Sequence, residues 1–131
     1  MTPGAAHSVA HILLVEDDAD SRDALKFLLE RSGHRVSVAA GGREGIDMAA
    51  SLAPDWAVID IGLPDIDGYE AARGMRASTP SVRLVALTGY GRPEDRQRAL
   101  DAGFDSHLLK PVDPHRLVEI IAPPESRPIG S

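Results

Sequence analysis

Five polar side chains stand at or directly after short apolar runs of the chain, where buried strands would end. In chain order they are Glu16, Asp17, Asp60, Thr88 and Lys110. Three carboxylates brought together repel one another, and each is driven toward its protonated form unless cations neutralise the group. Lys110 supplies one positive charge, and a hard divalent cation would supply the rest. The pattern therefore predicts an acidic pocket that needs a bound cation.

Magnesium suits such a pocket because it takes one or two carboxylates, keeps several waters and uses its remaining positions for phosphate oxygens. A carboxylate beside the cation can attack a phosphoryl group and form an aspartyl phosphate. Asp60 is the predicted nucleophile because it stands alone at a strand end, whereas the adjacent Glu16 and Asp17 are better placed to hold metal. The metal, the Lys110 ammonium and the Thr88 hydroxyl would then meet the charge on the transferred oxygens.

The elements that must position these side chains can be read from the apolar runs and the helical segments between them. Strands are expected at residues 11–15, 35–39, 56–60, 83–88 and 106–110. Helices are expected up to about residue 32, over 41–52 and 69–77, from residue 93, and over 114–121. Strict alternation predicts a parallel sheet with right-handed crossovers and helices on both faces. Ligand chemistry in such a sheet gathers at the carboxyl ends of its strands.

Three further aspartates are expected to shape the backbone rather than the chemistry. Asp18, or else Asp20, can cap the first helix, in which Ala24, Phe27, Leu28 and Arg31 are expected to share a face. Asp65 and Asp67 lie in a turn-rich loop before Gly68, where aspartate side chains commonly bond backbone amides.

Bulk composition limits the possible functions. The 131 residues are 43% hydrophobic and 26% charged, which is typical of one soluble globular domain. A net charge of -6 argues against direct nucleic-acid or anionic-membrane partners, and the absence of cysteine excludes thiolate chemistry. The chain has no apolar span or signal-peptide pattern, so we expect a cytoplasmic location. Residues 1–10 and 122–131 are expected to be flexible ends of a domain over 11–121.

Four stretches of the chain resemble the signature blocks of response-regulator receiver domains, which act in two-component phosphorelays. They are Leu-Val-Glu-Asp-Asp at 14–18, Val-Ile-Asp-Ile-Gly-Leu-Pro-Asp-Ile-Asp-Gly at 58–68, Ala-Leu-Thr-Gly at 86–89 and Leu-Lys-Pro-Val at 109–112. Each block alone is weak evidence, but their order and spacing from about His11 to Ile121 are specific. The resemblance implies an α/β, flavodoxin-like (βα)5 three-layer sandwich, with a doubly wound five-stranded parallel sheet in the order 2-1-3-4-5.

The resemblance also implies a role for each residue of the pocket. Asp60 would be the phosphoacceptor, Thr88 the switch hydroxyl and Lys110 the cation that grips the acceptor. The magnesium ligands would be Asp17, then Glu16, with Asp60 and the backbone carbonyl of Gly62. The Lys110–Pro111 peptide is commonly cis in this family. Two positions depart from the usual pattern: His107 replaces an aromatic residue, and Gly62 offers no side chain to position or block an attacking water.

The partners that the resemblance implies are a histidine kinase or a histidine phosphotransfer domain. The donor would dock around Ser21, Ala24 and Pro111–Val112, and the chain would be a monomer or a weak homodimer. The segment from Thr88 to Val112 particularly resembles receivers of hybrid histidine kinases. A stand-alone regulator, a relay intermediate and a fragment of a hybrid kinase all remain open.

Three rival functions are compatible with the same fold. A phosphohydrolase using an aspartyl phosphate usually has a second acid two residues after its nucleophile, and here that residue is Gly62. A nucleotide or flavin module needs a Gly-rich or Ser/Thr-rich phosphate cradle after the first strand, and here Glu16, Asp17 and Asp18 occupy that place. A pseudo-receiver would keep the fold without the chemistry, yet every reactive position holds the expected residue.

Overall fold

Strands and helices alternate along the whole of the described chain. The computed structural model describes residues 9–89 and 93–121. The strands are β1 (His11–Val15), β2 (Arg35–Ala39), β3 (Trp56–Asp60), β4 (Arg83–Thr88) and β5 (Ser106–Leu109). The helices are α1 (Ala19–Arg31), α2 (Gly42–Leu52), α3 (Gly68–Ser78), α4 (Pro93–Ala102) and α5 (Pro114–Ile121). The last strand therefore ends one residue earlier than expected, before Lys110.

The five strands form one parallel sheet in the order β2-β1-β3-β4-β5. The predicted strand order and fold class are confirmed. The order reverses direction after β1, so β1 and β3 are neighbours at the centre of the sheet. Chemistry in such sheets gathers in the crevice at this switch point, outside the carboxyl ends of the strands.

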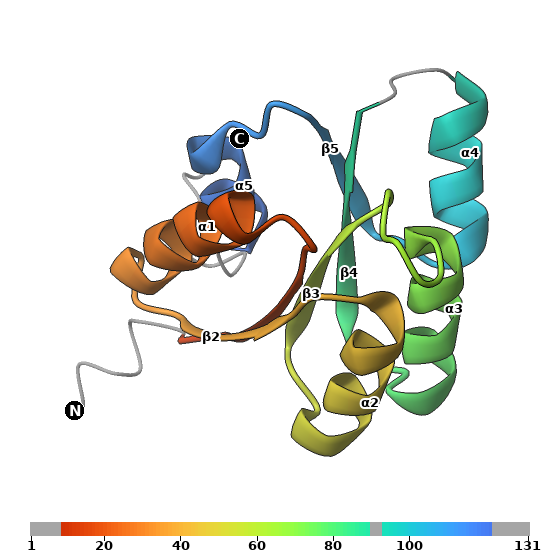
Figure 1. Ribbon diagram of the computed structural model, residues 1–131, viewed down its shortest axis with the longest axis horizontal. Coiled ribbons are helices and arrows are strands. Elements are labelled where there is room, and N and C mark those ends of the chain that lie inside the picture. The colour runs from red at the N-terminus through yellow and green to blue at the C-terminus, as the bar shows by residue number, and fades with distance from the viewer. Residues whose placement is uncertain (1–8, 90–92, 122–131) are drawn as a thin grey trace, which may run out of the picture.

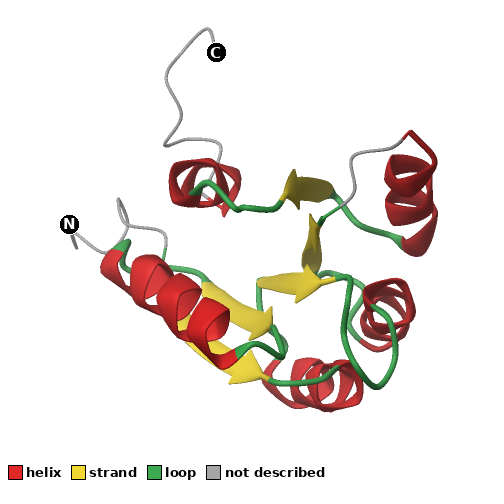
Figure 2. Ribbon diagram, turned by 45° about the horizontal axis from the view of Figure 1, so that its top comes forward, coloured by secondary structure: helices red, strands yellow, loops and turns green. Residues whose placement is uncertain are grey.

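Each face of the sheet packs against its own set of helices. Alternate β1 residues divide between the faces, with Leu13 and Val15 in the cluster that contains α2, α3 and α4 residues. Ile12 and Leu14 belong to the cluster that contains residues of α1 and α5. Figure 1 shows α1 and α5 on one side of the sheet and α2, α3 and α4 on the other, and Figure 2 shows the same three layers from a second direction. The central strands are apolar throughout because both of their faces are covered.

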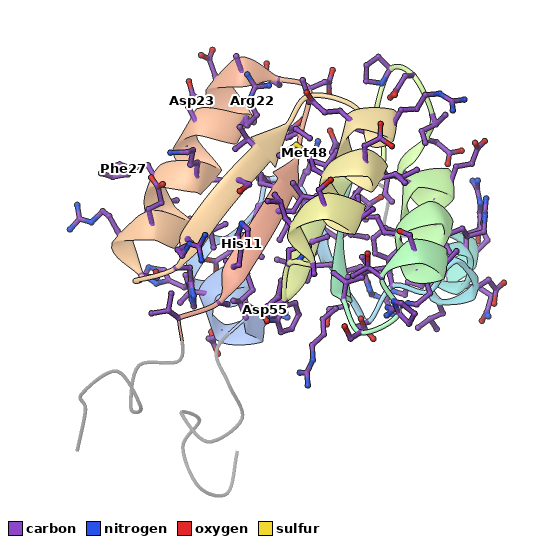
Figure 3. All side chains as sticks on the ribbon, turned by 90° about the horizontal axis from the view of Figure 1, so that it is seen from below. His11, Arg22, Asp23, Phe27, Met48 and Asp55 are labelled. Carbon is purple, nitrogen blue, oxygen red and sulfur yellow. The ribbon has the colours of Figure 1, made fainter. Side chains whose placement is uncertain are left out.

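The face of α1 that packs against the sheet is not the one that carries Phe27. Leu25 and Leu29 are buried, whereas Phe27 is 57% exposed. Figure 3 shows Phe27 pointing away from the sheet. The guanidinium of Arg31 lies 5.5 Å from the centre of the Phe27 ring, so this aromatic side chain is covered by a cation rather than by the core.

The aspartates expected to shape the backbone do so. The Ser21 N–H donates to Asp18 Oδ2 at 2.8 Å, which caps α1, and the Glu70 N–H donates to Asp67 Oδ1 at 2.9 Å, which caps α3. Each bond satisfies an amide that the first turn of a helix leaves unpaired.

The ends that were expected to be flexible lie outside the described residues, apart from Val9 and Ala10. Within the described ranges, no helix combines the length and apolar character that crossing a membrane requires.

Candidate functional site

The register of the sheet brings the predicted polar residues to one edge. Val15 pairs with Ile59, so Glu16 and Asp17 leave β1 level with the last residue of β3, Asp60. On the other side, Thr88 at the end of β4 pairs with Leu109 at the end of β5, and Lys110 follows directly. The five side chains singled out from the sequence therefore start from the same end of four neighbouring strands.

Three carboxylates form a compact group at this edge. Glu16, Asp17 and Asp60 each offer one oxygen, and these oxygens all lie within 4.8 Å of one another. Glu16 and Asp60 are buried, at 2% and 5% exposure, while Asp17 is exposed. Lys110 Nζ lies 3.0 Å from Asp60 Oδ2 and 3.8 Å from Glu16 Oε1. One ammonium group thus faces three carboxylates, which leaves a surplus of negative charge.

Both oxygens of the Asp60 carboxylate are held in place. Oδ1 accepts a hydrogen bond from the Gly62 N–H at 3.1 Å, and Oδ2 bonds the Lys110 ammonium. Lys110 is itself fixed through its backbone, because its N–H donates to the Thr88 carbonyl at 2.8 Å. The following Lys110–Pro111 peptide is cis, as the sequence resemblance implied. The Asp60 carboxylate therefore has a defined orientation at the end of β3.

The environment of the site raises the pKa of one of the carboxyl groups. Burial, followed by the neighbouring Asp60 carboxylate, raises the pKa of Glu16 from 4.5 to about 7. The Asp18 N–H, which donates to Glu16 Oε2 at 3.2 Å, and the Lys110 ammonium oppose this rise. Burial lowers the pKa of Lys110, but the bond to Asp60 and the charges of the acidic group outweigh it, so that this pKa is raised overall. Burial is thus the main cause of the rise at Glu16, and the neighbouring carboxylates are the cause of the rise at Lys110.

Arg22 is a contributor to the site that the sequence analysis did not identify. Its guanidinium Nη1 donates to the Glu16 carbonyl at 3.0 Å, from the first turns of α1. The Glu16 N–H meanwhile donates to the Ala39 carbonyl on β2 at 3.0 Å. The β1–α1 turn that carries Glu16 and Asp17 is therefore tied on both sides. A basic residue one turn into the helix after an acidic pair is the only sequence signal for this contact.

Thr88 and His107 lie together on the face of the sheet covered by α3 and α4. Both line a small enclosed space, which Tyr69 of α3 also lines. The Tyr69 ring packs edge-on against Phe104, with centroids 6.5 Å apart, and the guanidinium of Arg98 lies 4.1 Å from its centre. An aromatic side chain therefore lies beside the threonine, although it comes from α3 rather than from β5.

Comparison with known proteins identifies the family. The response regulator receiver domain family matches residues 12–122. The chain belongs to this family. An uncharacterised 14.6 kDa protein of Leptolyngbya boryana is 41% identical over 112 residues that cover 84% of this chain and 86% of that protein. The transcriptional regulatory protein AfsQ1 of Streptomyces coelicolor is 40% identical over 77% of this chain, but the match spans only 44% of AfsQ1.

Solved receiver domains share the fold throughout the described chain. The CheY-like receiver domain protein of Methanospirillum hungatei superposes with a TM-score of 0.81 at 34% identity, covering 86% of this chain and 90% of that one. The receiver domain of the sensor histidine kinase PA1611 from Pseudomonas aeruginosa gives 0.78 at 33% identity, covering 86% and 93%. That protein carries a magnesium ion in its active-site cleft. This receiver domain has an acidic group, Glu16, Asp17 and Asp60, in which a metal ion could be held.

Proposed function

We propose that this receiver domain accepts a phosphoryl group onto Asp60, with magnesium, from a histidine kinase or a histidine phosphotransfer domain. The observation that carries the proposal is the position of Asp60, a buried carboxylate held at one oxygen by Lys110 Nζ at 3.0 Å and grouped with two further acids. Buried charges are costly without a shared purpose. Transfer of a phosphoryl group supplies that purpose.

The donor atoms at the edge of the sheet fit magnesium. They are carboxylate oxygens of Glu16, Asp17 and Asp60, and the Gly62 carbonyl would complete the set. Hard oxygen donors suit this ion, and three carboxylates face one ammonium group, so a dication would balance the charge. When bound, the ion would neutralise oxygens of the incoming phosphoryl group and lower the cost of bringing it to three carboxylates.

The residues of the chain supply the remaining steps. An Asp60 oxygen attacks phosphorus, a new O–P bond forms, and the P–N bond to the donor imidazole breaks with its electron pair passing to the ring nitrogen. The Lys110 ammonium and the Thr88 hydroxyl then bond the phosphoryl oxygens. Because Thr88 ends β4, its movement toward the phosphoryl group would shift β4 and α4, and this would alter the surface formed by α4, β5 and α5.

The donor has a groove beside the acceptor in which to dock. A space of about 290 Å³ lies between α1 and the segment after β5, lined by Ser21, Ala24 and Leu28 on one side and Pro111 and Val112 on the other. Glu16 and Lys110 also line it, so the groove opens onto the acidic group. An apolar groove with charged groups at one end suits a helix that presents a phosphohistidine. Ser21→Arg and Ala24→Arg should reduce transfer from a phosphohistidine donor more than they reduce labelling by acetyl phosphate.

The test of the proposed acceptor is phosphorylation by acetyl phosphate with magnesium, followed by intact mass. Wild-type protein should gain the mass of one phosphoryl group, and Asp60→Asn should gain none. Asp55→Asn is a matched control at the opposite end of β3, where Asp55 Oδ2 accepts the His11 N–H at 2.8 Å (Figure 3). Equal labelling of wild type and Asp60→Asn would place the acceptor elsewhere.

A phosphohydrolase can be distinguished by its turnover of a phosphate monoester. Such an enzyme would release phosphate from a small-molecule monoester with many turnovers, using an acid to protonate the leaving group. The residue two places after Asp60 is Gly62, which has no such acid. We therefore expect no multiple-turnover release from p-nitrophenyl phosphate, and rapid release would favour the enzyme over the signalling domain.

A further inference from the structure

The loop between β3 and α3 is tied to a helix that lies far from it in the sequence. Asp65, in this loop, accepts two hydrogen bonds from the first turn of α2. The Gly42 N–H donates to its Oδ1 and the Arg43 N–H to its Oδ2, both at 2.9 Å. The residue before α2 is Gly41, which provides no side-chain cap of its own. Asp65 therefore caps α2 from outside and joins the helix to the loop that follows the acceptor.

The surfaces of the loop and the helix are shaped for this contact. A Cβ atom on Gly42 would lie 2.5 Å from Ile66 Cγ1, and one on Gly41 would lie 3.2 Å from the Asp65 carboxylate oxygens. The glycine pair thus permits an approach that larger residues would obstruct. Hydrogen bonds from the Arg43 and Gly42 backbone lower the pKa of Asp65 to about 2, so the carboxylate stays charged at neutral pH.

The same loop contains Gly62, whose carbonyl is the proposed backbone ligand of magnesium. The two ends of the loop are closed by the Gly68 N–H, which donates to the Ile61 carbonyl at 2.9 Å. Gly62 begins the closed segment, and its own N–H donates to Asp60 Oδ1. Asp65 fixes the far side of this segment to α2. Without the Asp65 side chain, the segment would still be closed between Ile61 and Gly68, but it would no longer be bonded to α2.

We propose that Asp65 is a positioning residue for the magnesium site, which holds the Gly62 carbonyl in place by anchoring the β3–α3 loop to the first turn of α2. The inference rests on the proposed function. Magnesium requires nearly ideal octahedral geometry, so a small displacement of one ligand lowers affinity. Groups that orient metal ligands commonly contribute tenfold or more to metal binding.

The experiment is a titration of the metal-free 131-residue protein with MgCl₂, followed by isothermal titration calorimetry. The dissociation constant of Asp65→Ala should rise about tenfold over wild type. Asp65→Asn removes the same charge but keeps one oxygen that can accept a hydrogen bond, so its dissociation constant should lie between the two. Far-UV circular dichroism of each variant checks that it is folded.

Asp67→Ala is the matched control, because Asp67 lies in the same loop and caps a different helix. It removes one negative charge and one capping bond, to the Glu70 N–H of α3, without touching α2. It should lower the urea midpoint, as Asp65→Ala should, yet bind Mg²⁺ nearly as tightly as wild type. If Asp65→Ala weakens Mg²⁺ binding no more than Asp67→Ala, the positioning role is wrong and Asp65 is only a helix cap. If wild type itself binds no Mg²⁺, the proposed function fails and this inference fails with it.

Discussion

The raised pKa of Glu16 predicts that the metal-free domain loses stability as the pH rises through the weakly acidic range. Glu16 is 2% exposed, and burial followed by the Asp60 carboxylate raises its pKa from 4.5 to about 7. The unfolded chain releases this proton near the ordinary value. Between these two values the folded protein binds more protons than the unfolded chain, so the free energy of unfolding falls with rising pH. Above the folded pKa the loss is complete.

The size of the loss follows from the shift. A pKa raised from 4.5 to about 7 corresponds to at most about 3 to 4 kcal/mol, at about 1.4 kcal/mol per pH unit. Water at the mouth of the acidic group screens part of this, and we expect a loss of about 1 to 2 kcal/mol. Glu16→Gln keeps a side chain of nearly the same size that carries no charge. The free energy of unfolding of this variant should therefore not fall by this amount as the pH rises.

The assay is urea unfolding in EDTA at about pH 5, near the lower end of this range, and at about pH 8, above its upper end. For each protein the free energy of unfolding at the higher pH is subtracted from that at the lower pH. The quantity compared is this loss in wild type minus the loss in Glu16→Gln. This difference cancels other groups, including His34, whose pKa burial lowers and which therefore favours folding as the pH rises. Glu30→Gln is a control at an exposed carboxylate, 2.9 Å from Lys26. Equal losses in wild type and Glu16→Gln would refute the assignment.

Three further outcomes follow from the same contacts. Lys110→Gln removes the ammonium that lies 3.0 Å from Asp60. The variant should bind Mg²⁺ more tightly in calorimetry, yet acetyl phosphate should label it about 100-fold more slowly than wild type. Faster labelling would contradict the role of Lys110. Mg²⁺ should raise the urea midpoint of wild type, and Asp17→Asn should reduce that rise; an equal rise would remove Asp17 from the metal site. Leu29→Ala should lower the free energy of unfolding by about 2 to 4 kcal/mol and Phe27→Ala by less than about 1; the reverse order would contradict the observed face of α1.

The sheet could be predicted because its strands are short apolar runs with clear boundaries. Residues 11–15, 56–60 and 83–88 were expected as strands and are strands, since a parallel sheet covered on both faces requires apolar residues at successive positions. The strand at 35–39 was predicted from its alternating pattern instead, and it is only partly buried at the edge of the sheet. The face of α1 was harder to predict. Apolar residues occur on more than one side of this helix, so either of two faces could have packed against the sheet. Phe27, although aromatic, is exposed beside Arg31.

The positions of the charged side chains could be predicted from one rule, that polar residues at the ends of parallel strands converge. Glu16, Asp17 and Asp60 do converge, and Lys110 meets two of them. The supporting contacts could not be predicted in this way. Arg22 acts on a backbone carbonyl, and Asp65 bonds backbone amides of another element, so neither contact leaves a recognisable pair of side chains in the sequence.

The chemical position of the phosphoryl group tests the central claim most directly. Protein labelled with acetyl phosphate and Mg²⁺ can be treated with borohydride, which reduces an aspartyl phosphate to homoserine, and its peptides can then be sequenced by mass spectrometry. We expect homoserine in place of Asp60, and only when Mg²⁺ was present during labelling. Homoserine at Asp17 or at any other aspartate, with Asp60 unchanged, would contradict the account.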